Sequence, residues 1–249
     1  TIEQALMAVM LQSANEMTLA VAELTTGSTK KFVEQMNLKA RQLGCTNTHF
    51  NNPNGLPDET HYTTAADMAK IARAAWFNPT FRKFASTQYY EIPPTNKFAE
   101  TRYLLNHHKM MKGQTYAYDG VLGGKTGYTE VAGNTLVTYA KNDNTYLVSV
   151  VLQSVNGAYS DTKALLDYGF NNYKQVTIFK KDTLIEQHLV DKMDNLTIDV
   201  KCKKDIVYTK AKSADAKVST KVNYKENFLP VKQGDVIGTL DVIVDGKTI

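Results

Sequence analysis

Two apolar stretches in the middle of the chain predict a pair of adjacent strands. The first, residues 134–140, alternates Leu136 and Tyr139 with smaller or polar residues, and the second, residues 146–153, is almost wholly apolar. A wholly apolar run is typical of a buried central strand. The residues between the two runs, Lys141 to Asn144, favour a turn, so the pattern predicts a β-hairpin.

A glycine-rich segment, Gly123 to Thr129, directly precedes this hairpin and reads Gly-Gly-Lys-Thr-Gly-Tyr-Thr. We expect Lys125 to Gly127 to lie on or beside the edge of an antiparallel sheet. Glycine lets another backbone approach closely, and the Thr126 hydroxyl and the Lys125 ammonium can donate hydrogen bonds. Such an edge can bind an extended peptide and hold its carboxylate. Taken alone, the segment is more simply a glycine-rich turn with a solvated lysine.

Apolar residues at helical spacing predict helices before and after these strands. Thr1 and Gln4 fit a capping box at the start of the first helix, which the segment 12–17 separates from a second. Later helices each have a polar residue placed to cap them, and these caps are Ser28, Thr63 or Thr64, and Ser160. Residues 46–61 follow neither period and predict an ordered loop rich in turn formers.

From about Val176 the pattern changes to short runs rich in Val, Ile, Thr and Lys. The predicted strands are residues 176–179, 196–200, 205–209, 218–224 and 236–244. We therefore predict two domains: an α/β domain over residues 1–175, with an antiparallel sheet and helices, and a small all-β, sandwich-like domain over residues 176–249.

The composition narrows the functional classes. Of the 249 residues, 43% are apolar and 22% charged, and the formal charge is +4. No basic run suited to nucleic acid is present, and no apolar stretch approaches the ~18 residues of a membrane span. Cys45 and Cys202 are predicted in different domains, so we expect no disulfide. The other candidate ligands lack metal-site spacing and an acidic partner, so neither a metal nor a cofactor is predicted; they are His49, His61, His107 and His108.

Two short motifs connect the start of the chain with the glycine-rich segment. Ser13-Ala14-Asn15 and Gly124-Lys125-Thr126-Gly127 match, in this order, two of the three motifs of active-site-serine penicillin-binding proteins. The chain resembles the D-alanyl-D-alanine carboxypeptidases, the low-molecular-mass penicillin-binding proteins of peptidase family S11. Further matches are residues 52–57, 61–68 and 164–170, together with the β domain, so the resemblance covers essentially the whole chain.

This resemblance implies a β-lactamase/transpeptidase-like fold and a serine-type D-Ala-D-Ala carboxypeptidase. Such an enzyme removes the terminal D-Ala of peptidoglycan stem peptides through an acyl-enzyme, and β-lactams mimic the same dipeptide. Ser13 would transfer a proton to the leaving amine, and Asn15 would bind the substrate backbone. With Lys125, these are the implied catalytic residues; the implied substrate-binding residues are Lys125, Thr126, Gly127 and Tyr128.

Three features depart from this family pattern or compete with it. Ser13 also fits a helix-capping box with Glu16, a structural role compatible with the catalytic one. Tyr128 stands where many members carry histidine. The arginine usually found before the penultimate helix has no counterpart in residues 156–159. Carboxylate binding would therefore depend more heavily on Lys125.

The family's nucleophile and base share a Ser-x-x-Lys motif upstream of Ser-x-Asn. Ser28 to Lys31 and Ser160 to Lys163 match that spacing, but both follow Ser13, and both serines are interpreted as helix caps. We expect the motif to lie before Thr1, and the chain alone to be inactive.

The same resemblance suggests a location and leaves two other functions open. We expect the protein at the extracellular face of a Gram-positive cytoplasmic membrane, attached only through an anchor beyond Ile249 if at all. A β-lactamase-like hydrolase and a non-catalytic binding protein for wall peptides remain the alternatives.

Overall fold

The structure, a computed structural model, describes residues 1–155, 157–191, 195–215, 217–226 and 228–248. The chain divides into two compact units, residues 1–171 and residues 172–249. The first unit contains α1 (Ile2–Gln12), α2 (Asn15–Thr26), α3 (Thr29–Gln42), α4 (Ala65–Trp76), α5 (Pro79–Ser86), β1 (Tyr89–Ile92), β2 (Arg102–Leu105), β3 (Val121–Thr129), β4 (Gly133–Asn142), β5 (Thr145–Ser154) and α6 (Ala158–Asn172).

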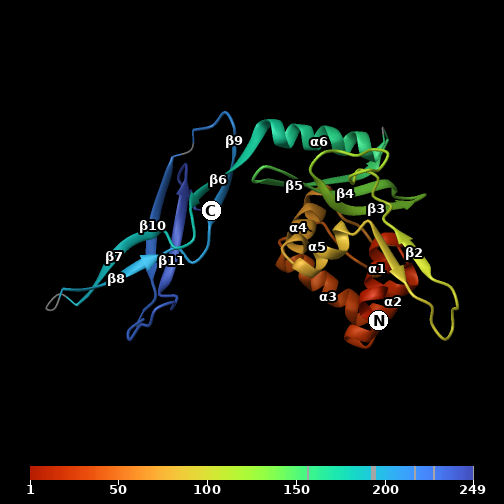
Figure 1. Ribbon diagram of the computed structural model, residues 1–249, viewed down its shortest axis with the longest axis horizontal. Coiled ribbons are helices and arrows are strands. Elements are labelled where there is room, and N and C mark those ends of the chain that lie inside the picture. Colours follow the sequence, from red (N-terminus) through yellow and green to blue (C-terminus); the bar gives the residue numbers. More distant parts are fainter. Residues whose placement is uncertain (156, 192–194, 216, 227, 249) are drawn as a thin grey trace. The chain divides into compact units, whose positions relative to one another are not determined.

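A three-stranded antiparallel sheet in the order β3-β4-β5 lies between α6 and the helices α4 and α5 (Figure 1). The predicted hairpin is confirmed: β4 and β5 pair with Asn142 opposite Thr145 at the turn. Among the described residues β3 pairs with β4 alone, with Lys125 opposite Val137. The glycine-rich segment is thus an edge strand, as predicted.

The two faces of this sheet are covered by different helices, because side chains alternate along each strand. Leu136 and Ala140 of β4 face α6 and pack with Leu166 and Phe170 in an apolar core. Tyr139 faces the other way. It stacks on Trp76 of α4 with ring centroids 4.3 Å apart, and its hydroxyl donates a hydrogen bond to the Ala72 carbonyl at 3.0 Å.

Helix starts test the capping predictions directly. The capping box at Thr1 is present, Ser28 Oγ accepts a hydrogen bond from the Lys31 amide, and Thr64 Oγ1 accepts one from the Asp67 amide. The predicted cap at Ser160 is wrong, because α6 begins two residues earlier. In that first turn the Ser160 hydroxyl donates back to the Gly157 carbonyl at 2.8 Å, a common serine bond in helices.

The second unit consists of strands, as its sequence texture predicted. They are β6 (Tyr173–Phe179), β7 (Leu184–Asp191), β8 (Leu196–Lys201), β9 (Ile206–Ala211), β10 (Val218–Tyr224), β11 (Gly238–Val244) and β12 (Lys247–Thr248). They form the sheets β6-β9, β7-β8 and β10-β11-β12. β7 was not predicted, since the polar run at residues 186–188 interrupts its apolar pattern. No helix among the described residues is long and apolar enough to cross a bilayer.

Candidate active site

Ser13 and Lys125 meet at the centre of the candidate site, although 112 residues separate them in the chain. Lys125 lies on β3, and Ser13 is the residue at which α1 ends. The Lys125 ammonium donates a hydrogen bond to Ser13 Oγ and another, of 2.8 Å, to the Thr126 carbonyl. The structure therefore brings together two of the three predicted catalytic residues.

The backbone at Ser13 explains how its hydroxyl reaches the edge strand. Ser13 adopts the left-handed conformation, with φ 56° and ψ 41°, and its amide bonds back to the Val9 carbonyl at 3.1 Å. The alternative role as a cap with Glu16 is wrong, because α2 begins at Asn15 and its cap position is Ala14, which makes no side-chain bond. The Ser13 hydroxyl is consequently directed to Lys125 rather than to α2.

Lys125 is half-buried, and its burial lowers the pKa of the ammonium to about 8. None of the ion pairs among the described residues involves Lys125. At neutral pH the side chain is still mainly charged, and its charge is not neutralised by a carboxylate of the described protein. A ligand carboxylate would offset the free-energy cost of burying this ammonium by supplying the counter-charge.

Glycines beside Lys125 are required by close contacts. A Cβ at Gly124 would lie 2.0 Å from the Val137 carbonyl oxygen and 2.8 Å from His108 Cδ2. A Cβ at Gly127 would lie 2.4 Å from Thr135 Oγ1. Gly124 is therefore required by a backbone contact, whereas the obstacle at Gly127 is a single side-chain oxygen.

His108 is a site-supporting residue that sequence reasoning missed. Its side chain is fully buried beneath Gly124, and Nε2 forms a 2.8 Å hydrogen bond with Thr138 Oγ1. Burial lowers the pKa of His108 to about 4, so the ring is neutral at physiological pH. The one signal for this role in the sequence is the apolar Met110, two residues further along the chain, which is buried in the structure. The His108 ring supports the edge strand from inside.

The remaining histidines considered for metal binding have structural partners. His61 Nδ1 accepts a hydrogen bond from the Asn51 amide at 3.1 Å, and His49 Nδ1 lies 2.6 Å from the Thr60 carbonyl oxygen. His107 is exposed, and partial desolvation followed by the charges of Lys125 and Lys109 lowers its pKa. Within the described part of the chain, no group of three or more His, Cys, Asp or Glu residues is placed to hold a metal.

Apart from the bond to the Thr126 carbonyl, no hydrogen bond between described residues links the other predicted site residues to the Lys125 ammonium. Asn15 is exposed on the first turn of α2, and no hydrogen bond between described residues links its side chain to Lys125. Thr126 follows Lys125 on the strand, so their side chains leave opposite faces of the edge. Tyr128 is 68% exposed. Thr126 and Tyr128 thus lie on the edge strand itself, and Asn15 lies on α2.

The two local Ser-x-x-Lys matches form no serine–lysine pair. Ser28 Oγ is engaged as a helix cap. Lys163 instead forms an ion pair of 2.6 Å with Asp167, one turn further along α6. Neither match is arranged as a nucleophile with its base.

The sheet with helices on both faces, and the Lys-Thr-Gly edge facing a serine at a helix end, define the class as penicillin-binding proteins with a transpeptidase-like fold. The structure matches that of penicillin-binding protein 5 from Haemophilus influenzae with a TM-score of 0.70 at 30% identity, covering 98% of this chain and 70% of that one. A family model described as D-alanyl-D-alanine carboxypeptidase matches residues 1–156, and one for the C-terminal domain of penicillin-binding protein 5 matches residues 173–249. The chain belongs to the D-alanyl-D-alanine carboxypeptidase family, peptidase family S11.

Two relatives are similar over the whole chain. The D-alanyl-D-alanine carboxypeptidase DacF of Bacillus subtilis (strain 168) is 31% identical over all of this chain and 64% of its own length. DacA of Escherichia coli (strain K12) is 30% identical over all of this chain and 60% of its own length. The chain therefore spans about six-tenths of the length of these relatives.

Proposed function

We propose that this chain forms the carboxylate-binding side of a serine-type D-Ala-D-Ala carboxypeptidase that trims peptidoglycan stem peptides. The observation that carries the proposal is the contact between Ser13 and Lys125 at an open sheet edge. In this proposal residues 1–175 provide the catalytic domain, and residues 176–249 form an accessory β domain.

Substrate recognition would take place along β3. An extended peptide can pair with the free backbone groups of an edge strand, and its terminal carboxylate, lying at the open edge between the two faces, would be held by the Lys125 ammonium from one face and the Thr126 hydroxyl from the other. Gly127 keeps the edge free of a side chain at this point, and the exposed Tyr128 lies next along the peptide's path. Asn15 would bind the peptide backbone from the α2 side.

Catalysis would proceed in two steps. A serine hydroxyl attacks the carbonyl carbon of the penultimate D-Ala, the C–N bond breaks, and an ester forms. The hydroxyl proton of the nucleophile passes to the leaving amine through Ser13, whose hydroxyl both accepts and donates. Water then hydrolyses the ester, and a β-lactam would acylate the same serine. Because the described Ser-x-x-Lys matches form no pair, this nucleophile must come from a motif other than Ser28–Lys31 or Ser160–Lys163.

The proposal is tested by ligand binding and by acylation. We expect the chain to bind diacetyl-Lys-D-Ala-D-Ala in a calorimetric titration. In a protein that also contains the family's upstream Ser-x-x-Lys motif, Ser13→Ala should slow labelling by a fluorescent penicillin. Ser28→Ala should leave that labelling rate unchanged. Peptide binding that is indifferent to the D configuration, or labelling that depends on Ser28, would refute the proposal.

We also propose that the protein acts at the extracellular face of the cytoplasmic membrane, in a Gram-positive cell. The family supports a cell-wall substrate outside the cytoplasm, and the low cysteine count is compatible with that compartment.

A further inference from the structure

His107 lies at the carboxylate end of the proposed peptide site, and the proposed reaction gives it no role. A Cβ at Gly124 would lie 2.8 Å from His108 Cδ2, so the chain passes the edge strand one residue before Lys125. His107 directly precedes His108, and its side chain is exposed whereas that of His108 is buried. His107 and Lys125 thus flank the contact between Gly124 and His108, on the side of Lys125 away from Tyr128.

The segment that contains His107 approaches β3 from the face on which the Thr126 side chain leaves the strand. Side chains two residues apart on a strand share a face, so Thr126 points to the face on which a Gly124 Cβ would meet His108. Lys125 leaves from the opposite face. A carboxylate at the open edge would therefore have the Lys125 ammonium on one side, and the Thr126 hydroxyl and the His107 segment on the other.

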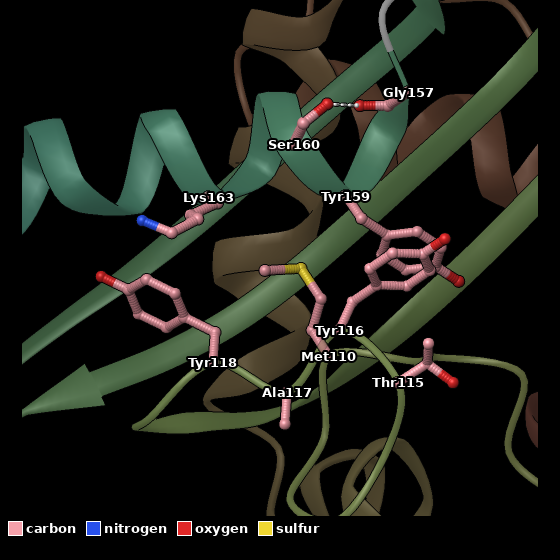
Figure 2. Close-up of a pocket in the computed structure, with 9 residues that line it drawn as sticks. All are labelled: Met110, Thr115, Tyr116, Ala117, Tyr118, Gly157, Tyr159, Ser160 and Lys163. Atoms are coloured by element: carbon pink, nitrogen blue, oxygen red, sulfur yellow. Dashed lines mark hydrogen bonds between the residues drawn. The ribbon is translucent and has the colours of Figure 1, made fainter.

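The backbone around His107 is held by two side chains. The His107 carbonyl accepts a 3.2 Å hydrogen bond from the Tyr159 hydroxyl, and Asn106 Oδ1 accepts one of 2.9 Å from the His108 amide. Figure 2 shows Tyr159 beside Tyr116 at a pocket of about 450 Å³, and the two rings stack with centroids 4.7 Å apart. The Tyr159 ring also meets the His108 ring edge-on at 6.4 Å. These ring contacts fix the Tyr159 hydroxyl, and with it the position of His107.

The donors already assigned to the peptide carboxylate do not fill its acceptor sites. A carboxylate has two oxygens with about four lone-pair sites, and a lysine ammonium has three N–H donors. Two of the Lys125 donors are engaged by Ser13 Oγ and the Thr126 carbonyl, which leaves one for a ligand. The Thr126 hydroxyl adds a second donor. A further donor on the Thr126 side would therefore find a free lone pair.

The His107 imidazole can supply that donor. Among the described residues no hydrogen bond, ion pair or ring contact uses this ring. Partial desolvation, followed by the positive charges of Lys125 and Lys109, lowers the pKa of His107. Tyr159, the titratable group of α6 that bonds to this segment, is neutral, because burial raises its pKa. A carboxylate would add a negative charge to surroundings in which the charges acting on His107 are positive.

We propose that the His107 imidazole donates a hydrogen bond to the terminal carboxylate of the peptide and so helps to determine the specificity for a free C-terminus. The inference rests on the proposed function, which places this carboxylate at Lys125 and Thr126. Recognition of the carboxylate then depends on charged or polar groups from both faces of the edge strand.

The test compares diacetyl-Lys-D-Ala-D-Ala with its C-terminal amide in calorimetric titrations at pH 7. His107→Ala removes the donor and should raise the dissociation constant for the acid about three- to tenfold, with little change for the amide. His107→Gln supplies an N–H donor of similar reach and should recover most of the affinity for the acid. Gln114→Ala is the matched control, because it truncates an exposed polar side chain of the neighbouring segment and should change neither affinity.

The ring itself gives a second readout, which a purely structural role would not move. In histidine-labelled protein, NMR should show the pKa of His107 below its ordinary value of 6.5 when the site is free. The acid peptide should raise this pKa, because a bound carboxylate favours the imidazolium, and the amide should not. The affinity for the acid should correspondingly rise as the pH falls through the pKa of the bound form. His107→Gln should lose this rise at acid pH.

Two outcomes would overturn the inference. Equal losses of acid and amide binding in His107→Ala would show that the residue only supports the segment. An undiminished preference of His107→Ala for the acid, with no effect of the peptide on the His107 pKa, would exclude the contact; if Lys125→Met still abolishes that preference, the proposed function stands. Wild-type protein that does not distinguish acid from amide would instead contradict the proposed function, and this inference with it.

Discussion

Replacing Lys125 tests the recognition of a substrate carboxylate most directly. Lys125→Met keeps an apolar stem of similar length and removes the ammonium that lies, without an ion-pair partner among the described residues, beside Ser13. A hydrogen bond to a charged group contributes roughly 1.5–3 kcal/mol, so the dissociation constant for diacetyl-Lys-D-Ala-D-Ala should rise about 10- to 100-fold. The corresponding peptide amide should bind weakly to both proteins, with little difference between them.

The pH dependence of binding gives an independent measure of the same charge. The pKa of Lys125 is about 8, and a peptide carboxylate is ionised throughout the neutral range. The affinity for the peptide carboxylate should be highest below pH 8 and should fall as the pH rises through 8, because the ammonium then loses its proton. The amide and the Lys125→Met variant should show no such decline.

Stability provides the control for misfolding. Burial lowers the Lys125 pKa in the folded protein below its ordinary value of 10.5, so the charged form is disfavoured by folding. Lys125→Met should therefore raise the Tm at pH 7, with the gain present below pH 8 and gone above the unfolded pKa. Lys31→Ala, a change at an exposed lysine of α3, should alter neither binding nor Tm. Calorimetric titration and thermal unfolding at several pH values make these measurements. Equal losses for the acid and the amide would show that Lys125 serves another purpose.

Three further predictions concern the site and the framework of the first unit. Ser13→Gly should raise the Tm, because glycine relieves a left-handed conformation that costs other residues about 1–2 kcal/mol, whereas Ser13→Ala should not; both should slow penicillin labelling. Gly127→Ala should lower the Tm through its contact with Thr135 Oγ1, and the added change Thr135→Ala should restore most of the loss; an unrestored double variant would place the strain in the backbone. Asp67→Asn should lower the Tm at pH 7, because the Asp67 carboxylate pairs with Lys70 at 2.9 Å and accepts from the Asn47 amide at 2.8 Å. These bonds lower the Asp67 pKa, so the advantage of wild type over Asp67→Asn should be present above pH 4 and vanish as acid protonates the carboxylate.

Local patterns in the sequence determined most of the framework. The apolar run of β5, the turn before it and the glycine-rich strand were predicted because strand pairing across a short turn depends on neighbouring residues. The caps at Thr1, Ser28 and Thr64 were predicted because each involves an amide within three residues of the capping side chain. The family motifs additionally indicated that Ser13 and Lys125 belong to one site.

Local sequence patterns could not predict the contacts between segments that are distant in the chain. Ser13 fits a capping box by spacing, yet α1 ends at Ser13 in a left-handed conformation and its hydroxyl meets Lys125, 112 residues away. His108 was considered only as a metal ligand, because its burial beneath Gly124 depends on the folded sheet. The lowered pKa of Lys125 likewise arises from burial by segments remote in sequence. Such properties depend on which surfaces exclude water from one another, and only the tertiary structure decides that.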